Sequence, residues 1–200
     1  MDRPPEESFK NNLLVLFSEI NDMFDEGVSN NVIKNSINIL PLIKLYIKKT
    51  DAEHMIKRFI KRTHKYWDVI KRKDDDYIKE QLLNVFNDVQ EKGVDAVKKD
   101  SEFQGEKASK IVNALSGDHF VVFKDLLSKS YQYEGEEIFI MDDERKDYIW
   151  NLIHSFVRHS LIYIHKTRKP IEGGKGYAVP FCDEIHVKEL AKEWNVKSIL

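Results

Sequence analysis

The sequence predicts an all-α protein, a single-domain bundle of about seven helices around a long central helix at about residues 143–168. Apolar residues recur at the 3.6-residue period of a helix along most of the chain. The 8 Gly and 5 Pro are few for 200 residues, and most of them fall between the periodic segments. With 42% hydrophobic and 11% aromatic residues, the chain has enough large side chains to bury a core.

The central helix is the longest regular pattern, from Asp142 to Lys169. Acidic residues stand at its beginning and cations at its end, as the helix dipole favours, and Pro170 follows. One broad face carries the apolar residues and is wide enough for a buried helix. The residues predicted on this face are Ile149, Leu152, Ile153, Phe156, Val157, Ser160, Tyr163 and Ile164.

Two helical segments are predicted near the N-terminus. Ser8 is placed to cap a helix that runs to about Asp25 and is ended by Gly27. An Ile-rich segment follows, and Pro41 should kink or break it, because proline removes a helical hydrogen bond. A second short piece then continues to about Lys48.

Asp51 is a good N-cap for a third helix, predicted over residues 52–71. The triplet from Asp74 to Asp76 ends it and caps the next helix. The further helices predicted from periodicity are 77–92, 106–115 and 119–130. The segment from Tyr131 to Met141 is predicted to be a loop, since the short apolar run at its end has no obvious partner strand.

The C-terminal part has a different composition, with the residues 170–180 rich in glycine and proline. This pattern indicates an irregular loop or a hairpin, and a last helix is predicted from Asp183 to Trp194. We therefore expect a helical domain over residues 1–169, with a loop and C-terminal helix at 170–200 packed on the same domain.

Charge and cysteine usage limit the class of protein. The formal net charge is −2, so an electrostatic partner must be bound by a local patch. The single cysteine, Cys182, cannot form an intramolecular disulfide, which points to a reducing compartment. The sequence has neither the apolar core of a signal peptide nor a run long enough to span a membrane. We expect a cytoplasmic protein.

The densest charge in the chain is a basic cluster on the third predicted helix. Interleaved with His64, Tyr66 and Trp67, its cations are placed to hold phosphates while the aromatic rings stack on bases. The alternative is an amphipathic core helix whose polar face is basic, or one that pairs with the acidic segment Glu134–Glu144 within the chain or in a neighbouring subunit. The basic cluster comprises Lys57, Arg58, Lys61, Arg62, Lys65, Lys71, Arg72 and Lys73.

A polar stripe on the long helix is a second candidate site. His154 and Arg158, one turn apart, are spaced to hold an anion, and His165 lies two turns further along. Arg158 takes the i+4 position where a metal site would need a second ligand, which argues against a metal. The alternative is a solvated face, or a polar face between helices.

Two short motifs contain residue types found in enzyme sites, but neither has the arrangement that such a site requires. Cys182 and His186 are close in sequence, but a thiol nucleophile needs a base oriented in space by a third group. In the segment Glu172–Gly176, Lys175 is followed by glycine and preceded by a helix, unlike a phosphate-binding loop. We therefore predict no catalytic residue, metal or cofactor.

Several features together resemble a known group of proteins. They are the Phe- and Leu-rich first helix, the kinked Ile-rich segment, the aromatic helix that leads into an Asp cluster, and the sequence Asp-Glu-Arg-Lys-Asp-Tyr-Ile-Trp-Asn-Leu-Ile at 143–153. Over residues 8–165 the chain resembles uncharacterised small helical proteins of nucleocytoplasmic large DNA viruses, with Ile149-Trp150 as the most specific part. The glycine-rich tail departs from that pattern. The resemblance implies a viral context, in the virion or the host cytoplasm, and transfers no active site.

These observations favour a non-enzymatic helical protein that acts through interaction, as a structural or accessory component, because helical periodicity accounts for nearly every conspicuous residue. A protein partner or self-association is expected. The alternative is a nucleic-acid-binding module that uses the basic cluster.

Overall fold

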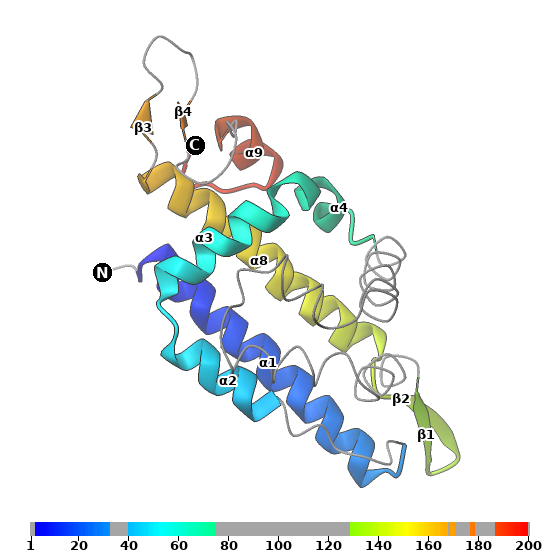
Figure 1. The fold of residues 1–200 in the computed structure, drawn as a ribbon. Helices are drawn as coiled ribbons and strands as arrows, with labels where there is room; N and C mark the ends of the chain where they lie inside the picture. Colours follow the sequence, from blue (N-terminus) through cyan, green and yellow to red (C-terminus); the bar gives the residue numbers. More distant parts are fainter. Residues whose placement is uncertain are drawn as a thin grey trace, which may run out of the picture. The chain divides into compact units, whose positions relative to one another are not determined.

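The computed structural model describes residues 3–32, 40–74, 129–167, 169–170, 177–178 and 187–199. These residues are mostly helical (Figure 1). The helices are α1 (Pro5–Ser29), α2 (Leu40–Lys49), α3 (Ala52–Thr63), α4 (Trp67–Lys71), α8 (Asp143–Thr167) and α9 (Val187–Glu193), with a 3-10 turn η1 (His64–Tyr66). The strands form two antiparallel pairs, β1 (Ser130–Tyr133) with β2 (Glu136–Phe139) and β3 (Lys169–Pro170) with β4 (Tyr177–Ala178).

The predicted helical character is confirmed, whereas the bundle of about seven helices is not shown. The described residues form about five helical segments when α3, η1 and α4 are counted as one bent segment. The helices predicted at 77–92 and 106–115, and nearly all of the one at 119–130, lie outside the described residues. The two strand pairs are additions that an all-α class does not include.

The chain forms two compact units. Unit 1 comprises Met1–Leu16, Tyr46–Lys73 and Asp147–Leu200, and unit 2 comprises Phe17–Leu45 and Asp74–Lys146. Helices α1, α2 and α8 each contribute residues to both units. A single domain over residues 1–169 stays a prediction.

Helix α1 is longer at both ends than the sequence predicts. It begins at Pro5, and proline suits the first helical position because a backbone N–H there would have no partner within the helix. The Ser8 N–H donates to the Pro4 carbonyl at 3.0 Å. Gly27 does not end the helix. The stop is at Asn31, whose φ of 57° turns the chain so that the Val32 N–H donates to the Gly27 carbonyl at 2.9 Å.

The predicted helix over 52–71 is instead interrupted. Asp51 caps its beginning as predicted, and its side chain accepts from the His54 N–H at 2.8 Å. The interruption follows Thr63, whose hydroxyl donates to the Phe59 carbonyl and accepts from the Trp67 indole N–H at 3.0 Å. A threonine that bonds back to its own helix favours a bend. The 3-10 turn η1 then carries the chain into α4.

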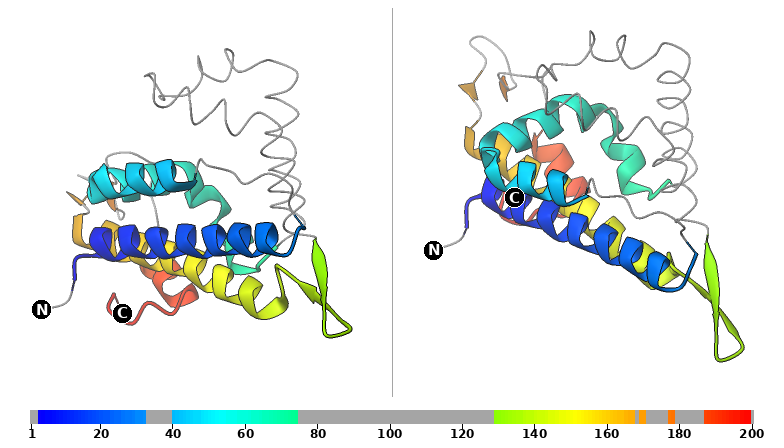
Figure 2. Two further views of the ribbon diagram at one scale, coloured as in Figure 1. Left: turned by 90° about the horizontal axis from the view of Figure 1, so that it is seen from below. Right: turned by 60° about the horizontal axis from the view of Figure 1, so that its bottom comes forward.

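The core of unit 1 surrounds α8. Three phenylalanine rings from α1, α3 and α8 meet there, with the Phe156 ring centroid 5.0 Å from Phe9 and 5.9 Å from Phe59. In both figures the first part of α1 lies beside α8, and α3 crosses it (Figures 1 and 2). The long helix predicted at 143–168 is confirmed as α8, and eight of its residues are buried. Trp150 and Leu161 are buried as well, although the predicted face omits them.

Ser160 is the buried polar residue on the apolar face of α8. Its side chain is fully enclosed, and its hydroxyl has no hydrogen-bond partner among the described residues. Replacing Ser160 with alanine is expected to raise the free energy of unfolding by about 1 kcal/mol, because it removes an unpaired buried hydroxyl and improves helix propensity. Urea unfolding of the two proteins measures this difference. A loss of more than 1 kcal/mol would instead show that the hydroxyl is paired.

The C-terminal tail contains a short strand pair. Lys169 lies opposite Ala178 and Pro170 opposite Tyr177, which favours the hairpin over the irregular loop in the predicted tail. The glycine-rich segment 171–176 and Cys182 lie outside the described residues. Helix α9 falls within the predicted range 183–194, and Asn195, with a φ of 52°, ends it.

Candidate functional site

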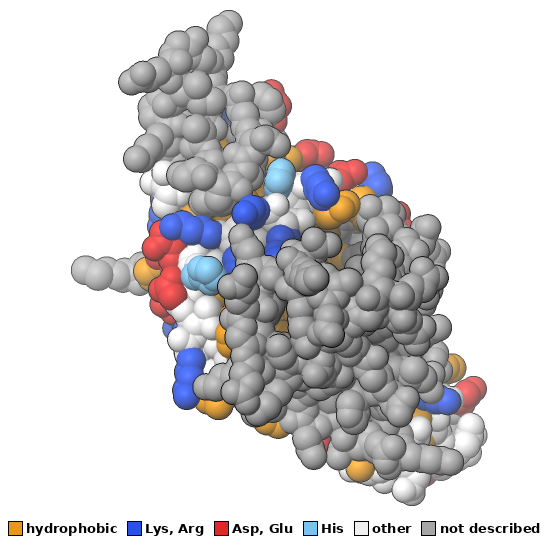
Figure 3. Space-filling model, viewed as in Figure 1, with side chains coloured by type: hydrophobic (Ala, Val, Ile, Leu, Met, Phe, Trp, Pro, Cys, Tyr) orange, Lys and Arg blue, Asp and Glu red, His pale blue; other side chains and the backbone are white. Residues whose placement is uncertain are grey.

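The basic cluster does not lie on one continuous helix. Its members are distributed over α3, η1, α4 and the turn that follows. Figure 3 shows Lys and Arg side chains along α3, with Asp and Glu side chains beside them at the beginning of the helix. Trp67 is buried, so its ring is not available to stack on a base.

Four members of the cluster form ion pairs with carboxylates of unit 1. Carboxylate partners this close reduce the potential that a polyanion would meet. Two pairs join neighbouring helical turns and two join α4 and its following turn to α9 and α8. The ion pairs are Lys57–Glu53 at 2.6 Å, Arg72–Asp68 at 3.4 Å, Lys71–Glu193 at 3.3 Å and Lys73–Asp147 at 2.6 Å.

Three exposed cations of the cluster lie on α3 and in η1. Lys61, Arg62 and Lys65 are exposed, and the Lys65 ammonium lies 4.9 Å from the centroid of the Tyr66 ring. These three residues are spaced along about one helical turn, so they form a small basic surface. That surface is smaller than the eight-residue cluster predicted from the sequence.

In the polar stripe, His154 has a structural role. The Ile70 carbonyl can only accept, so the His154 Nε2 donates to it, at 2.9 Å, near the end of α4. The imidazole also meets the Trp194 ring edge-on at a centroid distance of 5.3 Å. Burial lowers the pKa of His154, as do the charges of Arg158 and Lys73, while the hydrogen bond to Ile70 acts in the opposite direction. The neutral imidazole therefore joins α8 to α4 and the turn after α9.

The other two members of the polar stripe do not converge on His154. Arg158 is exposed one turn away, and His165 lies eleven residues along α8, a rise of about 16 Å. Among the described residues, no group of three His, Cys, Asp or Glu is placed to hold a metal ion. The three residues of the stripe thus lie at separate positions along one helix.

The pKa of His154 has a consequence for stability. The unfolded histidine, with a pKa near 6.5, binds a proton more readily than the folded one, so stability should be full above about pH 6.5 and fall below it. Replacing His154 with glutamine is expected to cost about 1–2 kcal/mol at pH 7.5, and less at pH 5, because the protonation penalty is then absent.

Urea unfolding at both pH values measures this effect. Replacing the exposed His54 with glutamine is the matched control and should change stability by less than about 0.5 kcal/mol at either pH. An equal loss at both pH values for the His154 variant would contradict the expectation.

The sequence does not predict the hairpin of β1 and β2, and the prediction of a loop over Tyr131–Met141 is wrong. Tyr131 lies opposite Ile138 and Tyr133 opposite Glu136, so the partner of the short apolar run is the segment directly before it. The two-residue turn has positive φ at both positions, 50° at Glu134 and 87° at Gly135, as in a type I′ turn. The alternation of tyrosines in Ser130–Tyr133 and the Gly135 turn were the available signals.

The turn is strained at Glu134, because a glutamate side chain disfavours the left-handed region. Asparagine tolerates this region better and is preferred in type I′ turns. Replacing Glu134 with asparagine is therefore expected to stabilise the hairpin by about 1 kcal/mol. Slower amide exchange at Tyr131 and Ile138 measures it, and unchanged exchange would show that the turn carries no strain.

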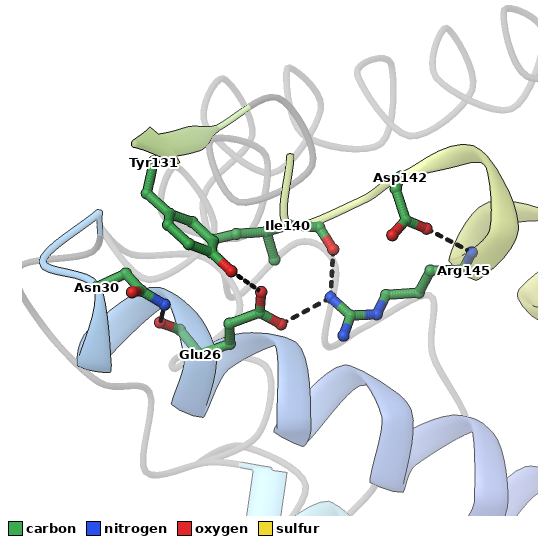
Figure 4. A network of polar contacts seen from close by, with 6 residues as sticks. All are labelled: Glu26, Asn30, Tyr131, Ile140, Asp142 and Arg145. Carbon is green, nitrogen blue, oxygen red and sulfur yellow. Dashed lines mark hydrogen bonds and ion pairs between the residues drawn. The ribbon is translucent and has the colours of Figure 1, made fainter. Parts of the chain in front are cut away.

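A polar network in unit 2 holds the base of the hairpin (Figure 4). The Arg145 guanidinium, from the first turn of α8, forms an ion pair with Glu26 of α1 at 2.8 Å and donates to the Ile140 carbonyl just after β2. The Tyr131 hydroxyl of β1 donates to the other oxygen of Glu26 at 3.0 Å, and this bond raises the pKa of Tyr131. Asp142 caps α8 and accepts from the Arg145 N–H at 2.7 Å. The base of the hairpin is thus attached to two helices.

The rest of the hairpin is exposed and lies beyond the end of α1 (Figure 2). Tyr133 is 60% exposed and Phe139 is 48% exposed, the two highest values among the large hydrophobic residues that the structure describes as exposed. The three glutamates of the hairpin are also exposed, and they are Glu134, Glu136 and Glu137. The β1–β2 hairpin therefore presents aromatic and acidic groups on a fixed base.

No family model, curated protein or solved structure matches the chain. The resemblance to proteins of large DNA viruses therefore stays a prediction, as does a cytoplasmic location. Within the part of the chain that the structure describes, no helix is long and apolar enough to cross a membrane.

Proposed function

We propose that this chain is a non-enzymatic interaction protein and that the β1–β2 hairpin is its docking element. The observation that carries the proposal is the exposure of Tyr133 and Phe139 on a hairpin whose base is held by the Glu26–Arg145 ion pair. Aromatic residues on a surface are the side chains that contribute most to protein interfaces.

Attachment at the base supports this role. A free two-stranded hairpin is at best marginally stable in water, so a partner would have to order it on binding. In this chain the contacts from Glu26 to Tyr131 and Arg145 hold the hairpin, so it is already ordered before a partner binds. The polar stripe supports no competing enzymatic proposal, since His154 is used for packing and for the hydrogen bond to Ile70.

Paired affinity purifications from the native source test the proposal. The wild-type protein is compared with a variant that carries Tyr133→Ser and Phe139→Ser, and with a control that carries Tyr148→Ser, an equally large residue that is 42% exposed on α8. We expect a co-purifying chain that is retained by the control and lost by the double variant. Identical recovery by all three, with thermal unfolding unchanged, would overturn the proposal.

Nucleic-acid binding is the second candidate, and the exposure of Lys61, Arg62 and Lys65 favours it. Such binding should weaken steeply with salt, because each neutralised phosphate releases counterions. Replacing Arg62 and Lys65 with glutamine should then reduce both the affinity for single-stranded RNA or DNA and the slope of its salt dependence. Absence of binding at 50 mM salt would remove this candidate.

A further inference from the structure

The outer edge of β2 has backbone groups available for a further strand. The Ile140 N–H donates to the Lys129 carbonyl, so these two residues form a hydrogen-bonded pair. Along an antiparallel ladder, hydrogen-bonded pairs alternate with pairs whose backbone groups point outward. The backbone groups of Tyr131 and Tyr133 therefore bond to β2, while those of Glu137 and Phe139 point away from β1. Among the described residues, no strand pairs with this edge.

The side chains along β2 define what would fit beside it. Successive residues of a strand point to opposite faces, so Glu136 and Ile138 share one face and Glu137 and Phe139 share the other. Each face thus presents one carboxylate followed by one apolar group, in the same order. Glu137 also accepts a bond from the Ser130 hydroxyl at 2.6 Å, which fixes its position on the face.

The edge of β1 is different. Its residues Ser130–Tyr133 carry no charge, so that edge offers no electrostatic selection. Charged residues on an exposed edge also discourage pairing with copies of the same edge. The acidic edge of β2 is therefore suited to a strand of opposite charge.

We propose that β2 accepts an extended basic segment of a partner protein as a third, antiparallel strand. An antiparallel partner runs opposite to β2, so its successive residues, from N- to C-terminus, lie opposite Phe139, Ile138, Glu137 and Glu136. The partner segment therefore has two apolar residues followed by two basic residues. This proposal rests on the hairpin being the docking element, and it adds the chemistry and direction of the partner segment.

Three synthetic peptides test the proposal with the full chain. They contain Thr-Val-Val-Lys-Lys-Thr, the acidic counterpart Thr-Val-Val-Glu-Glu-Thr and the reversed order Thr-Lys-Lys-Val-Val-Thr. We expect the first to shift the amide signals of Glu137 and Phe139 and to bind about tenfold tighter than the other two at low salt. The difference should shrink as salt rises.

Substitutions at the two edges separate backbone pairing from charge alone. Glu137→Gln removes one carboxylate, while Glu137→Pro also removes an outward N–H without removing a bond of the β1–β2 ladder. Gln132→Pro makes the same backbone change at the β1 edge and is the matched control. We expect the wild-type protein and Gln132→Pro to bind the basic peptide most tightly, Glu137→Gln to bind it less tightly and Glu137→Pro to bind it least tightly. The comparison uses variants whose Tyr131 and Ile138 amide signals show an intact hairpin.

Several outcomes would overturn this inference. Equal binding of the three peptides, or equal effects of Glu137→Gln and Glu137→Pro, would exclude strand addition by a basic segment. Edge signals that shift only with protein concentration would identify a second copy as the occupant. If the purifications still show hairpin-dependent recovery in these cases, the docking role stands and only the partner chemistry is wrong.

Discussion

Replacing Phe156 with alanine is expected to lower the free energy of unfolding by about 3–5 kcal/mol, the range for large-to-small substitutions in a packed core. Phe156 is 4% exposed, and its ring contacts those of Phe9 and Phe59, which come from two other helices. The truncation would therefore remove apolar burial and two aromatic contacts together. Because the three helices relax only partially around the truncated side chain, a cavity should remain.

Urea unfolding, followed by circular dichroism at 222 nm, measures this loss. The control is Tyr148→Ala on the same helix, where an exposed ring is removed and a change within about 0.5 kcal/mol is expected. A loss below about 1 kcal/mol at Phe156 would mean that α8 is not central to unit 1.

Replacing Glu26 with alanine is expected to cost about 2 kcal/mol and to release the base of the hairpin. The side chains of Glu26 and Arg145 are each only about a quarter exposed, so Arg145 would keep its charge in a poorly solvated position without its carboxylate. Tyr131 would lose its acceptor in the same substitution. We expect faster amide exchange along β1 and β2 in addition to the loss of global stability.

A double-mutant cycle isolates the ion pair from the other contacts of Glu26. The variants are Glu26→Ala, Arg145→Met and both together, and a coupling energy above about 1 kcal/mol is expected. The more exposed pair Lys71–Glu193 is the matched comparison, where the coupling should lie between about 0 and 1 kcal/mol. Equal coupling in the two pairs, or unchanged exchange in the hairpin, would mean that Glu26 does not hold the base.

The sequence is informative where a pattern is long and local. Helix α8 is predictable because its 25 residues carry both a regular apolar face and charges that match the helix dipole. The N-cap at Asp51 is predictable for the same reason, since cap and helix are adjacent in the chain. The end of α1 at Asn31 is not predictable in this way. Glycine is the commoner signal for the end of a helix, but Gly27 lies inside α1.

The functional candidates depend more on distant contacts, which a single sequence does not contain. His154 acts through Ile70, 84 residues away, so neither its helix nor its spacing reveals that its ring is already used. The hairpin has only four residues in each strand and a Glu-Gly turn in place of the more typical Asn-Gly. Its attachment to Glu26, 105 residues before Tyr131, is likewise invisible in the local pattern.

The wide separation of the helices that pack together also sets the order of events during synthesis. Asn12 and Ser155, which bond between α1 and α8, are 143 residues apart in the chain, and Glu26 and Arg145 are 119 apart. At about 5–20 residues per second, a ribosome needs roughly 7–30 s to extend the chain from the first helix to its partner. Before α8 is made, the apolar face of α1 has only earlier elements to pack against, such as α3 through Phe9 and Phe59, so the core of unit 1 can be completed only late in synthesis.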